Sequence, residues 1–451
     1  MHISVLCKVV DNFGDIGVAW RLCRRLAKIQ SKYKINLIVD DIEAFSKIED
    51  RLPRRLTAPR NDESHARGIS GQIESQTADI AGQSESRATA IAGRGESKAH
   101  VIAGQSKSRA HVIARSEATK QSITIDGIEI FPWNEKDLCH EVFSQNDGER
   151  LSIILELFQC GRPDWMERIL FEEKLERTVQ IIMIDYLTAE KYAEDFHCLQ
   201  SLTRSARVQK VNFMPGFTEK TGGLVIDDAW SEVPAWNSEG PALVFTYEND
   251  WCAMAEALSE YCAGSSRKVL VAQGRGKESF MQALNQVIST SSATIVEELP
   301  YLNQIEWDCM MKGCSALIIR GEESMSRACL SGIPFIWHAY PQSDEYQLVK
   351  VRALLERMRP HFGEEDFEIV EKAWLEINNN VSFPGLTRES VQDSDIQIVR
   401  SSRTMTQNVY AKFFCSIPRL VSGFRDFALS LRKNGDLAYN LMTYIEKLDI
   451  I

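Results

Sequence analysis

The chain has 451 residues, 44% of them apolar and 25% charged, which is ordinary for a globular protein of two or three domains. The net charge is −11, so no basic excess exists to neutralise nucleic-acid phosphates, and we expect no nucleic-acid partner. The sequence has no signal-peptide pattern and no apolar run of 18 residues, which predicts a cytoplasmic protein without membrane segments. Its 11 cysteines are scattered and form no C-x-x-C pair, so we expect reduced thiols and no metal site.

The first part of the chain alternates between strand and helix patterns. The opening run is mostly apolar, which suits a strand buried on both faces, and a helical spacing of apolar residues follows it. Further strands are expected at intervals after that helix. The expected strands are Ile3–Val10, Ile35–Val39, Ile128–Phe131, Ile153–Phe158 and Gln180–Asp185, and the expected helix is Ala19–Gln30.

One segment, residues 57–124, differs in composition from its surroundings. It has no Phe, Trp, Tyr, Leu, Met or Cys, and it repeats with a period of 11 residues, as in IAGRGESKAHV and IAGQSKSRAHV. Such a period can produce a helical supercoil, but each repeat offers too little apolar surface to offset the entropy of ordering the chain. We therefore expect residues 57–124 to be a disordered low-complexity insertion.

A second α/β series follows a Pro-, Gly- and Trp-rich linker. Two such series predict two doubly wound domains facing across a cleft, with ligands at the carboxyl ends of the strands. The expected strands are Leu243–Tyr247, Lys268–Ala272, Thr294–Glu298, Ala316–Ile319 and Pro334–His338. The expected divisions are an N-terminal domain at 1–230, a linker at 231–241, a C-terminal domain at 242–430 with a probable insertion at 381–407, and a terminal helix within 431–451 that crosses back to the N-terminal domain.

The first strand–helix junction carries two carboxylates, Asp11 and Asp15. Only Gly14 and Gly17 are present of the dinucleotide-binding glycine pattern, which weakens the case for a dehydrogenase. Either aspartate alone is most simply a turn or helix-capping residue. Together, beside a cleft, they could hold a cationic acceptor or act as a base.

The segment from Ile319 to Arg327 follows an apolar strand and enters a helix. The N–H groups at the start of that helix can bind a phosphate, and Arg320 and Ser324 could add hydrogen-bond donors. Glu322 is better placed on a sugar hydroxyl, and Glu323 favours the first helical turn. An ordinary capped helix with a surface ion pair is the structural alternative.

Aromatic and amide side chains near three other strand ends suggest a site for a planar base. Gln304 and Trp307 lie three residues apart and offer an amide edge and an aromatic face, and Tyr247 is a similar aromatic candidate. His338 ends a strand and is either a base or phosphate ligand, or a structural histidine.

Four segments resemble one family closely. VVDNFGDIGVAWRLCRRLA at 9–27, IDYLTAE at 184–190, FMPGFTEKTGGL at 213–224 and IIRGEESMSRACLSGIPFIWHAYPQ at 318–342 are similar to the bacterial protein-arginine rhamnosyltransferases that modify elongation factor P, the EarP family. The resemblance implies a GT-B fold with two Rossmann-like domains. It also implies inverting transfer of L-rhamnose from dTDP-β-L-rhamnose to an arginine guanidine of elongation factor P, without a metal or a resident cofactor, which supports relief of polyproline stalling.

The resemblance also assigns roles to individual residues. It implies that Asp15 is the general base and that Asp11 and Glu322 are required with it. Glu323 stands where the family usually has Asp, and Trp307 replaces a smaller aromatic residue. The residues implied to bind or line the donor pocket are Phe13, Gly14, Tyr247, Gln304, Trp307, Arg320, Glu323 and Ser324.

Two alternatives to the active enzyme stay open at this point. A GT-B transferase could use another sugar or acceptor, because specificity depends on pocket details. A chain impaired by its insertions could instead only bind nucleotide sugar or elongation factor P. Retention of the three carboxylates Asp11, Asp15 and Glu322 favours catalysis, since a pure binding role does not require all three.

Overall fold

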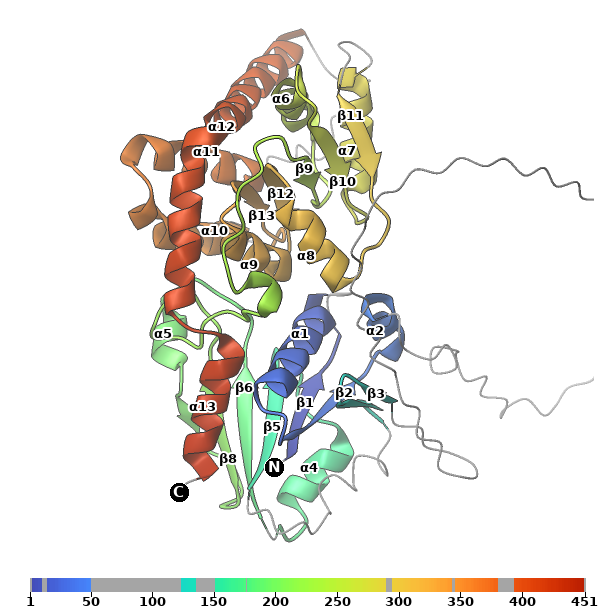
Figure 1. Cartoon of the computed structure of the whole chain (residues 1–451), viewed down its shortest axis with the longest axis vertical. Helices are drawn as coiled ribbons and strands as arrows, with labels where there is room; N and C mark the ends of the chain where they lie inside the picture. Colours follow the sequence, from blue (N-terminus) through green and yellow to red (C-terminus); the bar gives the residue numbers. More distant parts are fainter. Residues whose placement is uncertain are drawn as a thin grey trace, which may run out of the picture.

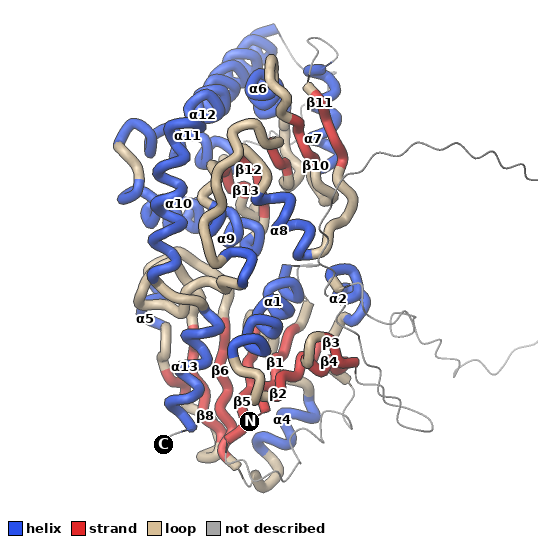
Figure 2. Tube along the Cα trace, in the orientation of Figure 1, coloured by secondary structure: helices blue, strands red, loops and turns tan. Residues whose placement is uncertain are grey.

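The computed structural model describes residues 2–9, 14–49, 123–134, 151–175, 177–288, 294–342, 345–379 and 393–449. Within these ranges the chain forms two α/β units, each built on a mainly parallel sheet flanked by helices (Figure 1 and Figure 2). This architecture confirms the expected fold class. The expected insertion at 57–124 lies outside the described residues, except for Ile123 and Thr124, which belong to a strand.

The N-terminal unit contains a sheet with the strand order β3-β4-β2-β1-β5-β6-β8-β7. Neighbouring strands are parallel except in the edge pairs β3–β4 and β7–β8. The strand order reverses between β1 and β5, which is where doubly wound sheets bind their ligands. The strands are β1 (His2–Cys7), β2 (Lys34–Val39), β3 (Ile123–Ile125), β4 (Ile128–Pro132), β5 (Leu151–Leu157), β6 (Thr178–Ile184), β7 (Gln200–Ser201) and β8 (Val208–Phe213).

The C-terminal unit repeats this plan on a smaller scale. Its sheet has the order β11-β10-β9-β12-β13, and every neighbouring pair is parallel. Here the strand order reverses between β9 and β12, so a second ligand position is expected at their carboxyl ends. The strands are β9 (Ala242–Val244), β10 (Lys268–Val271), β11 (Ile295–Glu298), β12 (Ala316–Arg320) and β13 (Phe335–His338).

Both faces of β1 are buried, which explains why its sequence is almost continuously apolar. Ile3, Val5 and Cys7 belong to a core shared with α1 and α13, whereas Leu6 belongs to a separate core shared with α4. Successive side chains of a strand point to opposite faces of the sheet, so both faces of β1 are buried under helices. The helices of the N-terminal unit are α1 (Gly14–Ile29), α2 (Ile42–Ile48), α4 (Asp164–Phe171) and α5 (Tyr192–Phe196).

The last two helices connect the units. In Figure 1, α12 runs down the C-terminal unit and α13 continues onto the N-terminal unit, where Leu437, Leu441 and Ile445 are buried in the core of α1 and β1. Residues 393–407 of the expected insertion at 381–407 are the first turns of α12, and residues 380–392 lie outside the described ranges. The remaining helices are α6 (Cys252–Cys262), α7 (Lys277–Ile288), α8 (Gln304–Lys312), α9 (Glu322–Ser331), α10 (Tyr346–Met358), α11 (Glu364–Asn378), α12 (Asp393–Lys433) and α13 (Leu437–Asp449).

The residue directly before the expected linker packs into the C-terminal unit. Trp230 is fully buried in the C-terminal core, and the Lys312 ammonium lies 5.0 Å from the centroid of its ring. Arg432 of α12 donates hydrogen bonds to the carbonyl oxygens of Trp230 (2.8 Å) and Leu330 (2.9 Å). The chain therefore enters the C-terminal unit through a packed and hydrogen-bonded segment. Among the described residues, no helix is long and apolar enough to cross a membrane.

Candidate active site

Asp15 lies in the first turn of α1, directly behind the carboxyl end of β1, and is 4% exposed. The sequence predicted a loop here, but the helix begins at Gly14. The positive end of the helix dipole favours an acidic residue in this turn. Burial, followed by the charge of Asp15, raises the pKa of Cys7 at the end of β1. The Asp15 carboxylate therefore lies close to the strand end where the sheet order reverses.

The structure says little about Asp11, Phe13 and Gly14, the other residues predicted at the junction of β1 and α1. Gly14 is exposed, and nothing lies within 4 Å of the place where a side chain would start. Asp11 and Phe13 lie outside the described residues. Their predicted roles therefore remain predictions.

Arg320 is the last residue of β12, and its guanidinium lies between two aromatic rings. The guanidinium carbon is 4.5 Å from the ring centroid of Phe245 and 4.5 Å from that of Tyr247. Such cation–π contacts fix the plane of the guanidinium. Its Nε is buried and has no hydrogen-bond partner among the described residues. A buried charged donor in this state is suited to an acceptor supplied by a ligand.

His338 packs against Tyr247 and accepts a hydrogen bond from its backbone. The Tyr247 backbone N–H donates to His338 Nδ1 at 3.3 Å, and the two rings meet edge to face. Burial, with the nearby charge of Arg320, lowers the pKa of His338 from 6.5 to about 3. The imidazole is therefore neutral at pH 7, and the structural alternative for this residue is the better supported one.

The N-terminus of α9 presents the predicted diphosphate-binding segment. Gly321 precedes the helix with a φ of 75°, in the region that glycine occupies without strain, and no side chain caps the helix. Ser324 is buried in the first turn, and Glu322 accepts a 3.0 Å ion pair from Lys350 of α10. The sequence analysis did not identify Lys350. The uncapped helix start leaves backbone donors available for an anion.

Gln304 and Trp307 come from the first turn of α8. Asn303 caps this helix in a reciprocal capping box with Glu306, which sets where the first turn begins. Gln304 Nε2 donates to the carbonyl oxygen of Gly17 on α1 at 2.7 Å, so the amide reaches across to the N-terminal unit. Trp307 contacts the Phe245 ring edge to face at 5.2 Å. Phe245 therefore contacts both Trp307 and the Arg320 guanidinium, which in turn contacts Tyr247.

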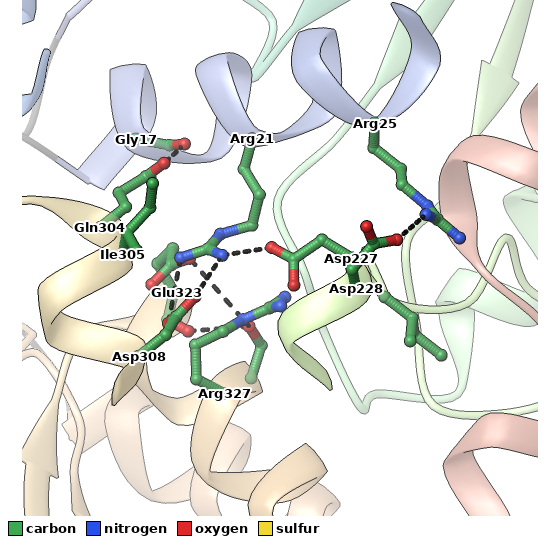
Figure 3. A network of polar contacts seen from close by, with 12 residues as sticks. Gly17, Arg21, Arg25, Asp227, Asp228, Gln304, Ile305, Asp308, Glu323 and Arg327 are labelled. Carbon is green, nitrogen blue, oxygen red and sulfur yellow. Dashed lines mark hydrogen bonds and ion pairs between the residues drawn. The ribbon is translucent and has the colours of Figure 1, made fainter. Parts of the chain in front are cut away.

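Glu323 points to the N-terminal unit, within a group of charged residues shown in Figure 3. Its Oε1 accepts from Arg21 Nε at 2.8 Å and lies 3.7 Å from Arg327 Nε. Arg21 also binds Asp308 of α8 at 2.7 and 3.3 Å and Asp227, which precedes the linker. We call these five residues the interdomain ion cluster. The resemblance implied a donor-binding role for Glu323, whereas here its carboxylate is engaged by Arg21.

The sequence analysis missed Arg21, Asp227 and Asp308. Arg21 lies between Trp20 and Leu22 on an apolar helix, and its three partners are 206, 287 and 302 positions away in the chain. No periodicity or local spacing connects residues so far apart. Within the described ranges, no group of three or more His, Cys, Asp or Glu side chains is placed to hold a metal ion.

Two described members of the predicted site, Gln304 and Glu323, contact the N-terminal unit directly. Gln304 joins α1, which carries Asp15, to α8, and Glu323 joins α1 to the start of α9. Trp307 Nε1 and Gln304 Oε1 are, like Arg320 Nε, buried without a hydrogen-bond partner in the described part of the chain. Unpaired buried polar atoms are costly, and these three could pair with polar groups of a bound ligand.

Two doubly wound units that meet at the carboxyl ends of their sheets, with carboxylates on one side and anion-binding donors on the other, form the architecture of a two-domain glycosyltransferase. Comparison with known proteins agrees with this class and is more specific. The chain belongs to the family described as Elongation-Factor P (EF-P) rhamnosyltransferase EarP, whose family model matches residues 3–81 and 87–446.

The chain is also similar to proteins named protein-arginine rhamnosyltransferase. It is 26% identical over 391 residues to the protein-arginine rhamnosyltransferase of Shewanella oneidensis, covering 78% of this chain and 80% of that protein. It is 25% identical over 403 residues to the enzyme of the same name from Pseudomonas aeruginosa, covering 83% and 86%. A solved structure described as "Structural basis for EarP-mediated arginine glycosylation of translation elongation factor EF-P" aligns with 99% of both chains, at 16% identity and a TM-score of 0.47.

Proposed function

We propose that this chain is an inverting glycosyltransferase that moves L-rhamnose from dTDP-β-L-rhamnose to the guanidine of one arginine on elongation factor P. Family membership across most of the chain supports the reaction class. The observation that carries the donor assignment is the set of unpaired buried atoms of Gln304, Trp307 and Arg320 around Phe245 and Tyr247. Aromatic rings, an amide and a guanidinium are suited to a thymine base and a diphosphate.

The acceptor chemistry requires carboxylates. A guanidinium stays protonated at neutral pH and has no free lone pair to attack with, so the enzyme must orient it and remove a proton as the C–N bond forms. A carboxylate pairs with the guanidinium fork and also accepts the proton. We assign the proton-accepting role to Asp15 and an orienting role to Asp11, and we place Glu322 on a hydroxyl group of the donor sugar.

The leaving group requires fixed positive charge. Negative charge develops on the nucleoside diphosphate as the sugar departs, and preorganised donors stabilise it without reorganisation in the transition state. We assign this role to the uncapped start of α9, with Ser324 and Arg320. Binding the remote base at Gln304 and Trp307 supplies energy for positioning. Since these groups supply the charge, we propose that no metal takes part, and transfer should be unchanged in EDTA.

The test is the intact mass of the cognate elongation factor P after incubation with this chain and dTDP-β-L-rhamnose. We expect a gain of one deoxyhexose on a single arginine. Asp15→Asn should abolish the gain while dTDP binding, measured by titration, is retained. The matched control is Asp41→Asn, because Asp41 caps α2 and asparagine caps equally well.

The outcomes separate the alternatives. No gain with dTDP still bound would indicate another acceptor or sugar, or an impaired enzyme. No gain and no dTDP binding would refute the donor site itself. Sugar transfer by Asp15→Asn would refute the assignment of the base.

A further inference from the structure

Arg21 lies at the point where the parts of the candidate site meet. Its side chain is 6% exposed, and its guanidinium contacts carboxylates from three separate segments. The two oxygens of Asp308 accept from Nη1 at 2.7 Å and from Nη2 at 3.3 Å, while Glu323 accepts from Nε at 2.8 Å. Asp227 accepts a further hydrogen bond from Nη1. A guanidinium can make all these bonds at once because its donors are spread over a planar fork.

Two of the three carboxylate partners of Arg21 lie on elements that carry proposed site residues. Arg21 is on α1 with Asp15, Asp308 is on α8 with Gln304 and Trp307, and Glu323 lies between Glu322 and Ser324 on α9. Figure 3 shows Arg21 descending from α1 onto the C-terminal helices. The position of Asp15 relative to the start of α9 therefore depends on this side chain.

The charges of the interdomain ion cluster favour one arrangement of the units. Two buried cations, Arg21 and Arg327, meet the three carboxylates of Asp227, Asp308 and Glu323. Burial alone would lower the pKa of Arg21, but Glu323, Asp308 and Asp227 together raise it. If the units separated, Asp308 and Glu323 would lose their main cation. Removing one partner from a buried ion group is strongly unfavourable, so the contact geometry is sharply defined.

We infer that Arg21 is a positioning residue for the transfer reaction, which holds the acceptor-side carboxylate of α1 in register with the donor-side helices α8 and α9. This inference rests on the proposed function. In this role Arg21 acts through its carboxylate partners Asp227, Asp308 and Glu323. A misplacement of about 1 Å between reacting groups can cost a factor of about 10² in rate. Loss of the register should therefore reduce kcat more than it reduces donor affinity.

The first variant is Arg21→Lys, which keeps the positive charge but replaces the fork with a single ammonium. We expect kcat to fall by about 10- to 100-fold, while KM for the donor and the Kd for dTDP change by less than about threefold. The matched control is Arg25→Lys, one turn further along α1. Arg25 is paired with Asp228 and Asp436, which lie outside α8 and α9 (Figure 3). This control should retain kcat within about twofold.

A second measurement reports the arrangement of the units without using activity. Cys198 and Cys415 are exposed and lie in the N-terminal and C-terminal units, so spin labels at these positions report the distance between units once other accessible cysteines are replaced by serine. Arg21→Lys should broaden the distance distribution, and Arg25→Lys should not. Asp308→Asn removes one charge from the cluster with little change in shape, and it takes the place of Arg21→Lys if that variant does not fold.

The inference is overturned if kcat of the folded variant stays within twofold of the wild type, or if kcat and dTDP affinity fall by the same factor. If the wild-type chain transfers no rhamnose, the proposed function fails, and the distance measurement alone then tests whether Arg21 sets the arrangement of the two units. Unchanged distances in Arg21→Lys would then overturn the inference as well, whereas a broadened distribution would support Arg21 as the residue that sets the register.

Discussion

Acid should destabilise the folded chain through His338, and the effect can be isolated with one substitution. Burial, with a contribution from Arg320, lowers the pKa of His338 from 6.5 to about 3, so the folded chain holds this imidazole neutral. The unfolded chain binds a proton there at pH values between these two. Stability is therefore lost as pH falls below about 6.5, and the loss is complete near pH 3.

The magnitude follows from the two pKa values. The full difference is worth about 5 kcal/mol, and the part lost between pH 7 and pH 5 is about 2 kcal/mol. The reference variant is His338→Asn, whose side-chain oxygen can still accept from the Tyr247 N–H. Asparagine is smaller and lowers stability at both pH values, so the informative quantity is the change with pH.

The assay is urea unfolding of the full chain at pH 7 and pH 5, followed by tryptophan fluorescence. Wild type should lose about 2 kcal/mol more than His338→Asn over this interval, because the other titrating groups are common to both chains. Equal losses in the two chains would refute the assignment of a buried neutral histidine. A larger loss in the variant would refute the sign of the effect.

Three further changes test the fold and the donor site. Gly332→Ala should cost about 1–3 kcal/mol of stability in chemical denaturation. Gly332 ends α9 at a φ of 68°, and a Cβ there would meet Val233 Cγ1 at 2.8 Å. An unchanged unfolding midpoint would contradict this prediction. Leu441→Ala should lower the free energy of unfolding by about 2–5 kcal/mol, because Leu441 of α13 is buried in the N-terminal core. Tyr439 is exposed on the same helix, so Tyr439→Ala should lower it by less than about 1 kcal/mol. Similar losses in the two variants would contradict the packing of α13. Trp307→Ala should weaken dTDP binding by about tenfold or more in a calorimetric titration, and unchanged affinity would show that the base binds elsewhere.

Local patterns predicted most of the parallel strands of both sheets but missed β3, β7 and β8 of the N-terminal sheet. The run that forms β1 is apolar on both faces because helices cover both sides, so its sequence alone identified it. β8 was not anticipated, because the consecutive polar residues Gln209 and Lys210 interrupt the alternation of its apolar residues. The start of α1 was expected too late, because Asp15 and Gly14 resemble loop residues even though an acidic residue suits a first helical turn.

The candidate site was accessible to sequence analysis to the extent that its residues occur in continuous motifs. Arg320 and Ser324 belong to one strand–helix junction, and Gln304 and Trp307 to one helical turn. Their residue types and spacing predicted hydrogen-bond donors for a phosphate and a binding site for a planar base. The partners of Glu323 and Glu322 were not accessible in this way, because Arg21 and Lys350 come from other segments and belong to no shared motif.

The sequence by itself determined the fold class, the family and the identity of most proposed site residues, because hydrophobic periodicity and motif chemistry are local properties of a chain. Tertiary structure alone decided how the two units meet. Arg21 joins Asp308 and Glu323 across 287 and 302 positions only after both sheets have formed. Ion pairing depends on distance and burial in space, and neither quantity is encoded in spacing along the chain.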